Sequence, residues 1–153
     1  WARGQAWGLY GFTVMYRMTK DDRYLQQAQK IAEFILSHPR LPEDMVPYWD
    51  FDAPDIPNTF RDASAAAVNA SALLELAQFS DPGLKARYLN AAEKILITLS
   101  SDAYRAKEGE NGGFILMHSL GALPFNSEVD VPLTYADYYF LEALKRYKDW
   151  YLK

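Results

Sequence analysis

The sequence contains no cysteine and only two histidines, His38 and His118, among its 153 residues. The lack of cysteine excludes disulfide bonds and thiolate ligands for zinc, and two histidines are too few for a typical histidine-built metal site. No apolar run approaches the roughly 20 residues that a membrane-spanning helix requires. Acidic and basic side chains nearly balance, 20 against 16, which argues against the basic surface of a nucleic-acid-binding protein. We therefore expect no metal ion, no nucleic-acid partner and no membrane partner.

Hydrophobic and aromatic side chains are abundant. Half of the residues are hydrophobic, and there are 4 tryptophans, 11 tyrosines and 8 phenylalanines. That is enough to bury a core and to exclude general disorder. The length suits one domain or part of a larger one. Because helical patterning begins directly at Trp1 with no leader before it, we expect the chain to be the C-terminal part of a longer protein.

The spacing of apolar residues predicts five helical segments, at about 2–18, 22–37, 62–79, 84–99 and 133–151. The first and third are apolar or small on nearly every side, which is typical of helices buried on most faces. The second and fourth carry a single apolar stripe, as surface helices do. This alternation indicates stacked helical hairpins, each with one inner and one outer helix, and so an all-α fold.

Two long connections interrupt the helices, at about 39–60 and 102–132. The first contains five prolines and several aromatic residues, so we expect it to pack against the helices. Within the second, residues 114–117 are predicted to form a short strand. Connections of this length in a compact domain are usually functional or mobile.

The opening heptapeptide WARGQAW is the densest candidate site. Arg3 can form a planar, bidentate pair with a carboxylate or sulfate. Trp1 and Trp7 offer faces for a sugar ring, and Gln5 can donate to and accept from hydroxyl groups. Together these residues are suited to an acidic sugar. The alternative is that both tryptophans belong to the core and Arg3 forms a structural ion pair.

Other polar residues are candidates for acid–base chemistry or for hydrogen bonds to a sugar. Asp50, Asp52 and Asp62 are carboxylates of the sort that glycosidic acid–base chemistry uses. Asp62 lies best for it, near a helix start, although Asp at that position is more often a cap or the partner of an arginine. His118 and Ser119 follow the predicted strand. A histidine there could bond a sugar hydroxyl or exchange protons, or simply lie on the surface.

The WARGQAWGLYG string at 1–11 resembles the motif of the unsaturated glucuronyl hydrolases, glycoside hydrolase family 88. Further matches, in order along the chain, lie at 46–51, 61–67, 126–132 and 135–144. The related unsaturated rhamnogalacturonyl hydrolases usually carry Asn where Gln5 stands, which favours the first family.

The resemblance implies a fold and a reaction. The fold is an α/α-hairpin toroid of the (α/α)6-barrel type, of which this chain would be about half. Residues 1–153 would form the C-terminal part of a single catalytic domain whose N-terminal part is absent. The reaction removes the terminal 4,5-unsaturated uronic acid from oligosaccharides that polysaccharide lyases produce, by hydrating the vinyl ether double bond. No cofactor is implied.

The resemblance also implies roles for individual residues. The catalytic Asp of the family lies before the WARGQ motif, so no catalytic residue is expected in this chain. Asp62 and Asp137, at inner-helix starts, are expected to have network roles. The chain would contribute to substrate binding through Trp1, Arg3, Gln5, Trp7, His118 and Ser119.

Two other functions stay open. One is an unsaturated rhamnogalacturonyl hydrolase, and the other is a non-catalytic helical-repeat module that binds a glycan or protein. The expected partners are an unsaturated uronide-terminated oligosaccharide and the missing N-terminal half of the domain. The sequence leaves the location open between bacterial cytoplasm and periplasm.

Overall fold

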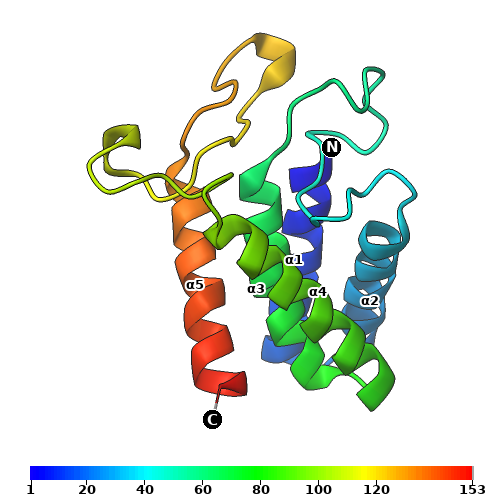
Figure 1. The fold of residues 1–153 in the computed structure, drawn as a ribbon. Helices are drawn as coiled ribbons and strands as arrows, with labels where there is room; N and C mark the ends of the chain where they lie inside the picture. The colour runs from blue at the N-terminus through cyan, green and yellow to red at the C-terminus, as the bar shows by residue number, and fades with distance from the viewer. Residues whose placement is uncertain (153) are drawn as a thin grey trace.

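Five α-helices and two long loops make up the chain within residues 1–152, which are the residues that the computed structural model describes (Figure 1). The helices are α1 (Ala2–Thr19), α2 (Asp22–Ser37), α3 (Ala63–Leu76), α4 (Pro82–Ser100) and α5 (Thr134–Tyr151). Short 3₁₀ turns form at η1 (Ala77–Phe79), η2 (Asn111–Gly113) and η3 (Leu123–Phe125). The five predicted helices are confirmed, with ends that differ by a few residues.

The prediction of a strand at 114–117 is wrong. An isolated bridge between Arg105 and Leu116 forms there instead, because side chains bind the backbone in place of a neighbouring strand. The carboxylate of Asp137 accepts hydrogen bonds from the amides of Ile115 and Leu116, both at 2.8 Å. The side-chain amide of Asn111 donates to the carbonyl oxygen of Leu116 at 3.0 Å. The segment is therefore held as a loop.

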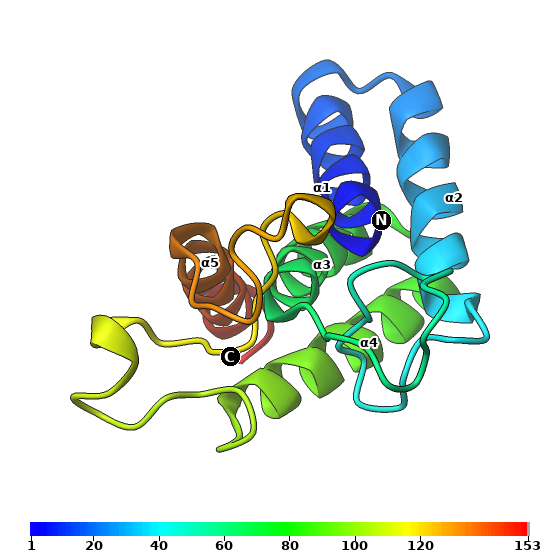
Figure 2. The same cartoon turned by 90° about the horizontal axis from the view of Figure 1, so that it is seen from above.

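The helices α1, α3 and α5 form one row, and α2 and α4 lie on one side of it (Figure 2). α3 is in the middle and packs against α1, α4 and α5, while α2 packs against α1. The three helices of the row all begin at the end of the molecule where the two long loops lie (Figure 1). This arrangement of an inner row and an outer layer agrees with the predicted alternation of buried and one-striped helices.

Small side chains allow α3 to lie in the middle. All 14 of its residues are buried, and most of them are alanine or serine. Side chains this small let neighbouring helices approach closely on every side, and the interior has little room for larger ones. The helix begins after Asp62, whose side chain accepts a hydrogen bond from the amide of Ser64. Asp62 is thus a cap, in line with one of its two expected roles.

A buried group of charges joins the three inner helices. Glu75 of α3 is 2% exposed and lies between Arg17 of α1 and Arg146 of α5, at 3.1 and 3.0 Å. An unpaired carboxylate would be costly at this depth. The two guanidinium groups therefore make the position tolerable, and each ties a neighbouring helix to α3.

Glu142 on α5 extends this group. Its carboxylate accepts hydrogen bonds from the hydroxyls of Tyr10, at 3.1 Å, and Ser71, at 2.5 Å. It also lies 3.3 Å from Arg146. Burial raises the pKa of Tyr10 to about 12; Arg146 opposes the rise and Glu142 adds to it. Tyr10 therefore stays protonated in the folded chain well above the usual range of tyrosine.

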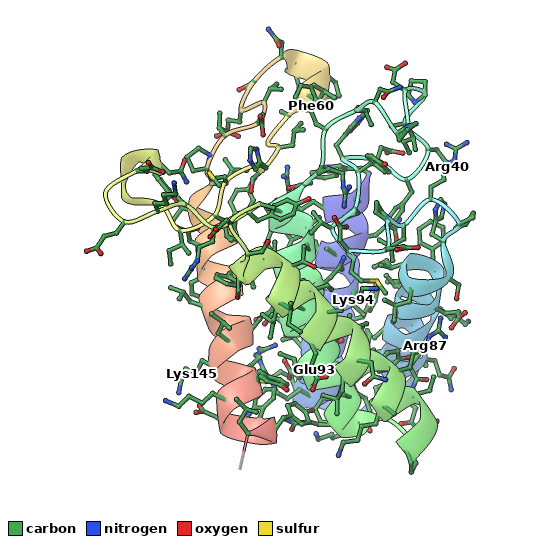
Figure 3. All side chains as sticks on the ribbon, in the orientation of Figure 1. Arg40, Phe60, Arg87, Glu93, Lys94 and Lys145 are labelled. Atoms are coloured by element: carbon green, nitrogen blue, oxygen red, sulfur yellow. The ribbon has the colours of Figure 1, made fainter. Side chains whose placement is uncertain are left out.

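One face of α5 is open. Tyr138 and Leu141 are exposed there, and with Lys145 and Trp150 they line a groove of about 540 Å³. Figure 3 shows Lys145 projecting from this side, away from α3. Exposed apolar side chains gathered on one helix face mark a surface for interaction. No helix within residues 1–152 is both long and apolar enough to cross a membrane.

The close packing of α3 predicts a strong response to a larger side chain. Ala66 is fully buried, and replacing it by Leu should lower the free energy of unfolding by about 1–3 kcal/mol through overpacking. The matched control is Ala86→Leu on the exposed side of α4, which should change little. Urea denaturation of the complete protein that carries this chain measures both. Equal effects at the two positions would contradict the packing described here.

The raised pKa of Tyr10 predicts a loss of stability at alkaline pH. The unfolded chain ionises this tyrosine near pH 10, whereas the folded chain holds the proton to about 12. The unfolded state therefore loses the proton first, and the free energy of unfolding falls as pH rises above about 10. Denaturation curves on both sides of that pH should show a steeper decline for the native protein than for Tyr10→Phe. Identical slopes would contradict the assignment.

Candidate functional site

The candidate site lies at the end of the molecule where α1, α3 and α5 begin (Figures 1 and 2). The loops at 38–62 and 101–133 meet these helix starts. The amide of Ala2 donates to the carbonyl of Trp49 at 2.9 Å, and the amide of Ala63 donates to the carbonyl of His118 at 3.0 Å. Each loop is therefore fixed to the first residue of an inner helix, and the WARGQAW segment lies beside both.

Arg3 is buried at the centre of this site, with 4% of its surface exposed. Its guanidinium donates to Asp62 and to the hydroxyl of Ser64, both at 3.2 Å, and to the carbonyl of Gly121 at 2.6 Å. It also donates to the carbonyl of Leu120. The planar group thus binds atoms of the chain itself, as in the structural ion pair considered above. Direct binding of a sugar by Arg3 stays a prediction.

Asp62, the partner of Arg3, is fully buried. It accepts hydrogen bonds from the amide and hydroxyl of Ser64, at 3.0 and 2.5 Å, and from the amide of Leu120 at 3.4 Å. Burial raises its pKa, whereas Ser64, Arg3 and the Leu120 amide oppose the rise. This carboxylate is enclosed by protein donors, so its place in the site is structural.

Two aromatic rings enclose the Arg3 guanidinium. Its carbon atom lies 4.8 Å from the ring centre of Trp1 and 5.2 Å from that of Tyr135, which is within the range of cation–π attraction. The Trp1 ring lies against Gly4, where an added β-carbon would come within 2.9 Å of it. Trp1 is nonetheless 53% exposed, so one of its surfaces remains open to a ligand.

Trp7 and Gln5 lie differently from Trp1. The Trp7 ring packs edge-on against Tyr139, with centres 5.0 Å apart, and tilted against Tyr135 at 6.1 Å. It is half-buried between α1 and α5, which agrees with the alternative that this tryptophan belongs to the core. Gln5 is half-buried on the first turn of α1. Neither joins the open surface that Trp1 presents, and their contacts with substrate stay predictions.

The structure does not bring His118 and Ser119 together with the WARGQAW segment. The His118 ring pairs with Asp130 at 2.7 Å and lines a separate cavity of about 400 Å³ with Arg61. Ser119 is fully buried, and its backbone forms two hydrogen bonds with Val131, at 3.1 and 3.0 Å. The structure thus places the Ser119 hydroxyl inside the chain, and its contact with a substrate stays a prediction.

Sequence reasoning missed an open hollow beside Trp1, here called the aromatic cleft. It has a volume of about 310 Å³ and is lined by Trp1, Trp49, Phe125 and the loop 120–124. Phe125 is 85% exposed. The aromatic string at 48–51 was the available signal for Trp49. A single Phe within a turn gives no such signal, so Phe125 could not have been chosen.

Two other acidic residues bind the backbone. Asp50 accepts a hydrogen bond from the amide of Asp52 at 2.8 Å and so helps to fix its loop. Asp137 holds the loop at 115–116, in line with a network role. Within residues 1–152, no group of three or more metal-ligating side chains comes together in a way that could hold an ion.

The fold and site define a class of protein. Three parallel inner helices with outer helices on one side, and a site built from loops where the inner helices begin, form part of an α/α barrel.

No protein-family model matches the chain. The unsaturated glucuronyl hydrolase of Formosa agariphila is 51% identical over 153 residues, covering 100% of this chain and 38% of that protein. The unsaturated chondroitin disaccharide hydrolase of Streptococcus pyogenes serotype M1 is 37% identical over 154 residues, covering 98% and 38%.

Solved structures agree with these relatives. A crystal structure of an unsaturated glucuronyl hydrolase specific for heparin aligns with a TM-score of 0.94 at 58% identity, over 97% of this chain and 40% of that one. A variant of the Streptococcus agalactiae enzyme, complexed with dGlcA-GalNAc6S, aligns with a TM-score of 0.87 at 36% identity, over 98% and 40%.

The chain is therefore homologous, along its whole length, to the unsaturated glucuronyl hydrolases, and the resemblance of its motifs is confirmed. It spans only 38% of the length of the curated relatives described above, which is somewhat less than the expected half.

The enclosed Arg3–Asp62 pair predicts a large loss of stability when one partner loses its charge. Replacing Asp62 by Asn leaves a buried guanidinium without its carboxylate, so the free energy of unfolding should fall by about 3–5 kcal/mol. The control is Glu33→Gln, which breaks the exposed pair of Glu33 with Arg87 and should cost about 1 kcal/mol or less. Chemical denaturation of the complete protein compares the two. A loss for Asp62→Asn no larger than that for Glu33→Gln would contradict the structural role.

Proposed function

We propose that the complete protein containing this chain removes the terminal 4,5-unsaturated uronic acid from oligosaccharides made by polysaccharide lyases. Water is added across the vinyl ether: a proton goes to C4 and the oxygen of water to C5. The hemiketal that results opens and releases the next sugar. The observation that carries this proposal is the similarity to unsaturated glucuronyl hydrolases over 97–100% of the chain.

The chain would be the C-terminal part of a single barrel domain. Two observations support this. The chain covers about two fifths of each relative, and α5 presents an open face with Tyr138 and Leu141 exposed. In a closed barrel that face would pack against the next inner helix. The remainder of the domain is then a partner of this surface and the source of the catalytic Asp.

Within such an enzyme the residues of this chain bind the substrate and orient it. The buried Arg3–Asp62 pair holds the loop at 120–121 against the starts of α1 and α3. Trp1 offers an open ring surface beside it. Asp62 and Asp137 both serve protein donors, so neither is free to exchange a proton with a substrate. This agrees with an acid–base residue supplied from elsewhere in the domain.

The two alternative functions have less support. The relatives described above are named glucuronyl or chondroitin disaccharide hydrolases, and none of them is named a rhamnogalacturonyl hydrolase. A helical-repeat binding module would need neither the buried Arg3 at the candidate site nor the loops that are attached to it. The substrate class is therefore a glycosaminoglycan-type unsaturated disaccharide, as in the structure that holds dGlcA-GalNAc6S.

The test is the loss of double-bond absorbance when the complete protein is mixed with unsaturated disaccharides from chondroitin and from heparin. The native protein should remove the absorbance of at least one of them. Arg3→Ala should lower the rate at least about 10-fold, because a displaced loop misplaces the substrate. Unchanged absorbance with every disaccharide would contradict the proposal. An unchanged rate for Arg3→Ala would remove Arg3 from the site but leave the function.

A further inference from the structure

We infer that the cavity between the two long loops, here called the Tyr104 cavity, is a binding site for the ring of an uncharged sugar. Its volume is about 400 Å³, which is within the range of sites for small ligands. The side chains of its lining that matter here are Asp44, Phe60, Arg61, Tyr104, His118 and Asp130. The inference does not depend on the proposed function, because it concerns binding and no turnover.

The hydroxyl of Tyr104 is the first sign of a ligand. The residue is 7% exposed and lines the cavity, yet within residues 1–152 its hydroxyl forms no hydrogen bond, although a buried tyrosine usually finds a partner. Burial raises the pKa of Tyr104, while Arg61 opposes the rise and Asp44 adds to it. The hydroxyl therefore lies near two charged groups of the wall and is available to a ligand.

The charged groups of the Tyr104 cavity are already paired with one another. Arg61 forms an ion pair with Asp44, and its Nε donates to the carbonyl of Val46 at 2.8 Å. The Nδ1 atom of His118 lies 2.7 Å from the carboxylate of Asp130. A free ion would thus find no unmatched charge among these four side chains, which argues for an uncharged ligand.

The polar atoms that remain suit the hydroxyl groups of a sugar, each of which both donates and accepts. Arg61 and Tyr104 can donate to such a group. Nε2 of His118 can accept, because the other ring nitrogen carries the proton shared with Asp130. Phe60 lies among the loops at this end of the molecule (Figure 3) and is 42% exposed. Its ring offers a face for the apolar side of the sugar.

The walls of the Tyr104 cavity are held in place by the fold. The hydroxyl of Thr98, on α4, donates to the carbonyl of Asp44 at 2.9 Å. The amide of Met117 donates to the carbonyl of Tyr104 at 2.8 Å, and the rings of Tyr104 and His118 meet edge-on with centres 6.1 Å apart. A site that is ordered before its ligand arrives loses less entropy on binding.

Tyr104→Phe in the complete protein tests the inference by isothermal titration calorimetry, with N-acetylglucosamine and N-acetylgalactosamine as uncharged probes. The native protein should bind at least one of them, with an affinity that does not change with salt. The variant should bind it about 5-fold more weakly, because one hydrogen bond is lost. The matched control is Tyr88→Phe, the same change at a buried tyrosine of α4 that does not line the cavity, and its affinity should stay native.

Phe60→Ala is the second variant. It should also weaken binding about 5-fold through the lost ring contact, with a native midpoint of thermal unfolding because the side chain is exposed. Native affinity in both Tyr104→Phe and Phe60→Ala overturns the inference, as does a native protein that binds neither sugar. Binding of sodium sulfate that Tyr104→Phe weakens, without binding of either sugar, would show an anion site and overturn it too. None of these results changes the proposed function, which is measured by turnover.

Discussion

The buried pair of Arg3 and Asp62 is the interaction on which the candidate site of this structure depends. Both groups lose water on folding, which is costly unless every donor and acceptor is matched. Here Ser64, two carbonyl groups and two aromatic rings complete the shell. The pair joins residues 59 positions apart and fixes the loop at 120–121 to two helices. The shape of the site follows from one charge satisfied within the protein.

The sequence was sufficient for the helices because their signal is periodic and local. Segments with a single apolar stripe, such as α2, and segments with small residues all round, such as α3, differ in how apolar residues are arranged along the sequence. That difference gave the inner and outer layers before any contact was known. The strand expected at 114–117 shows the limit. Its residues have strand-like composition, but Asp137 and Asn111 take the hydrogen bonds that a partner strand would have needed.

The candidate site was less predictable because it depends on contacts between distant segments. Arg3 could be recognised as important, but two readings of it were chemically equal until the position of Asp62 and of the 120–121 carbonyls was known. Ser119 could be placed in a loop, but neither its burial nor its backbone pairing with Val131 could be foreseen. Phe125 carries no local signal at all. Composition and spacing locate the end of the barrel that matters, but not which side chains face its opening.

The parallel order of α1, α3 and α5 has an electrostatic consequence. Each helix places a partial positive charge of about half a unit at its first turn, and three of them converge where the loops meet. This field is built into the backbone, so it survives any exchange of side chains and needs no free arginine. A chain with net charge −4 can therefore still present a rim that favours anions. The backbone supplies this field, which leaves Arg3 to hold the loops of the site in place.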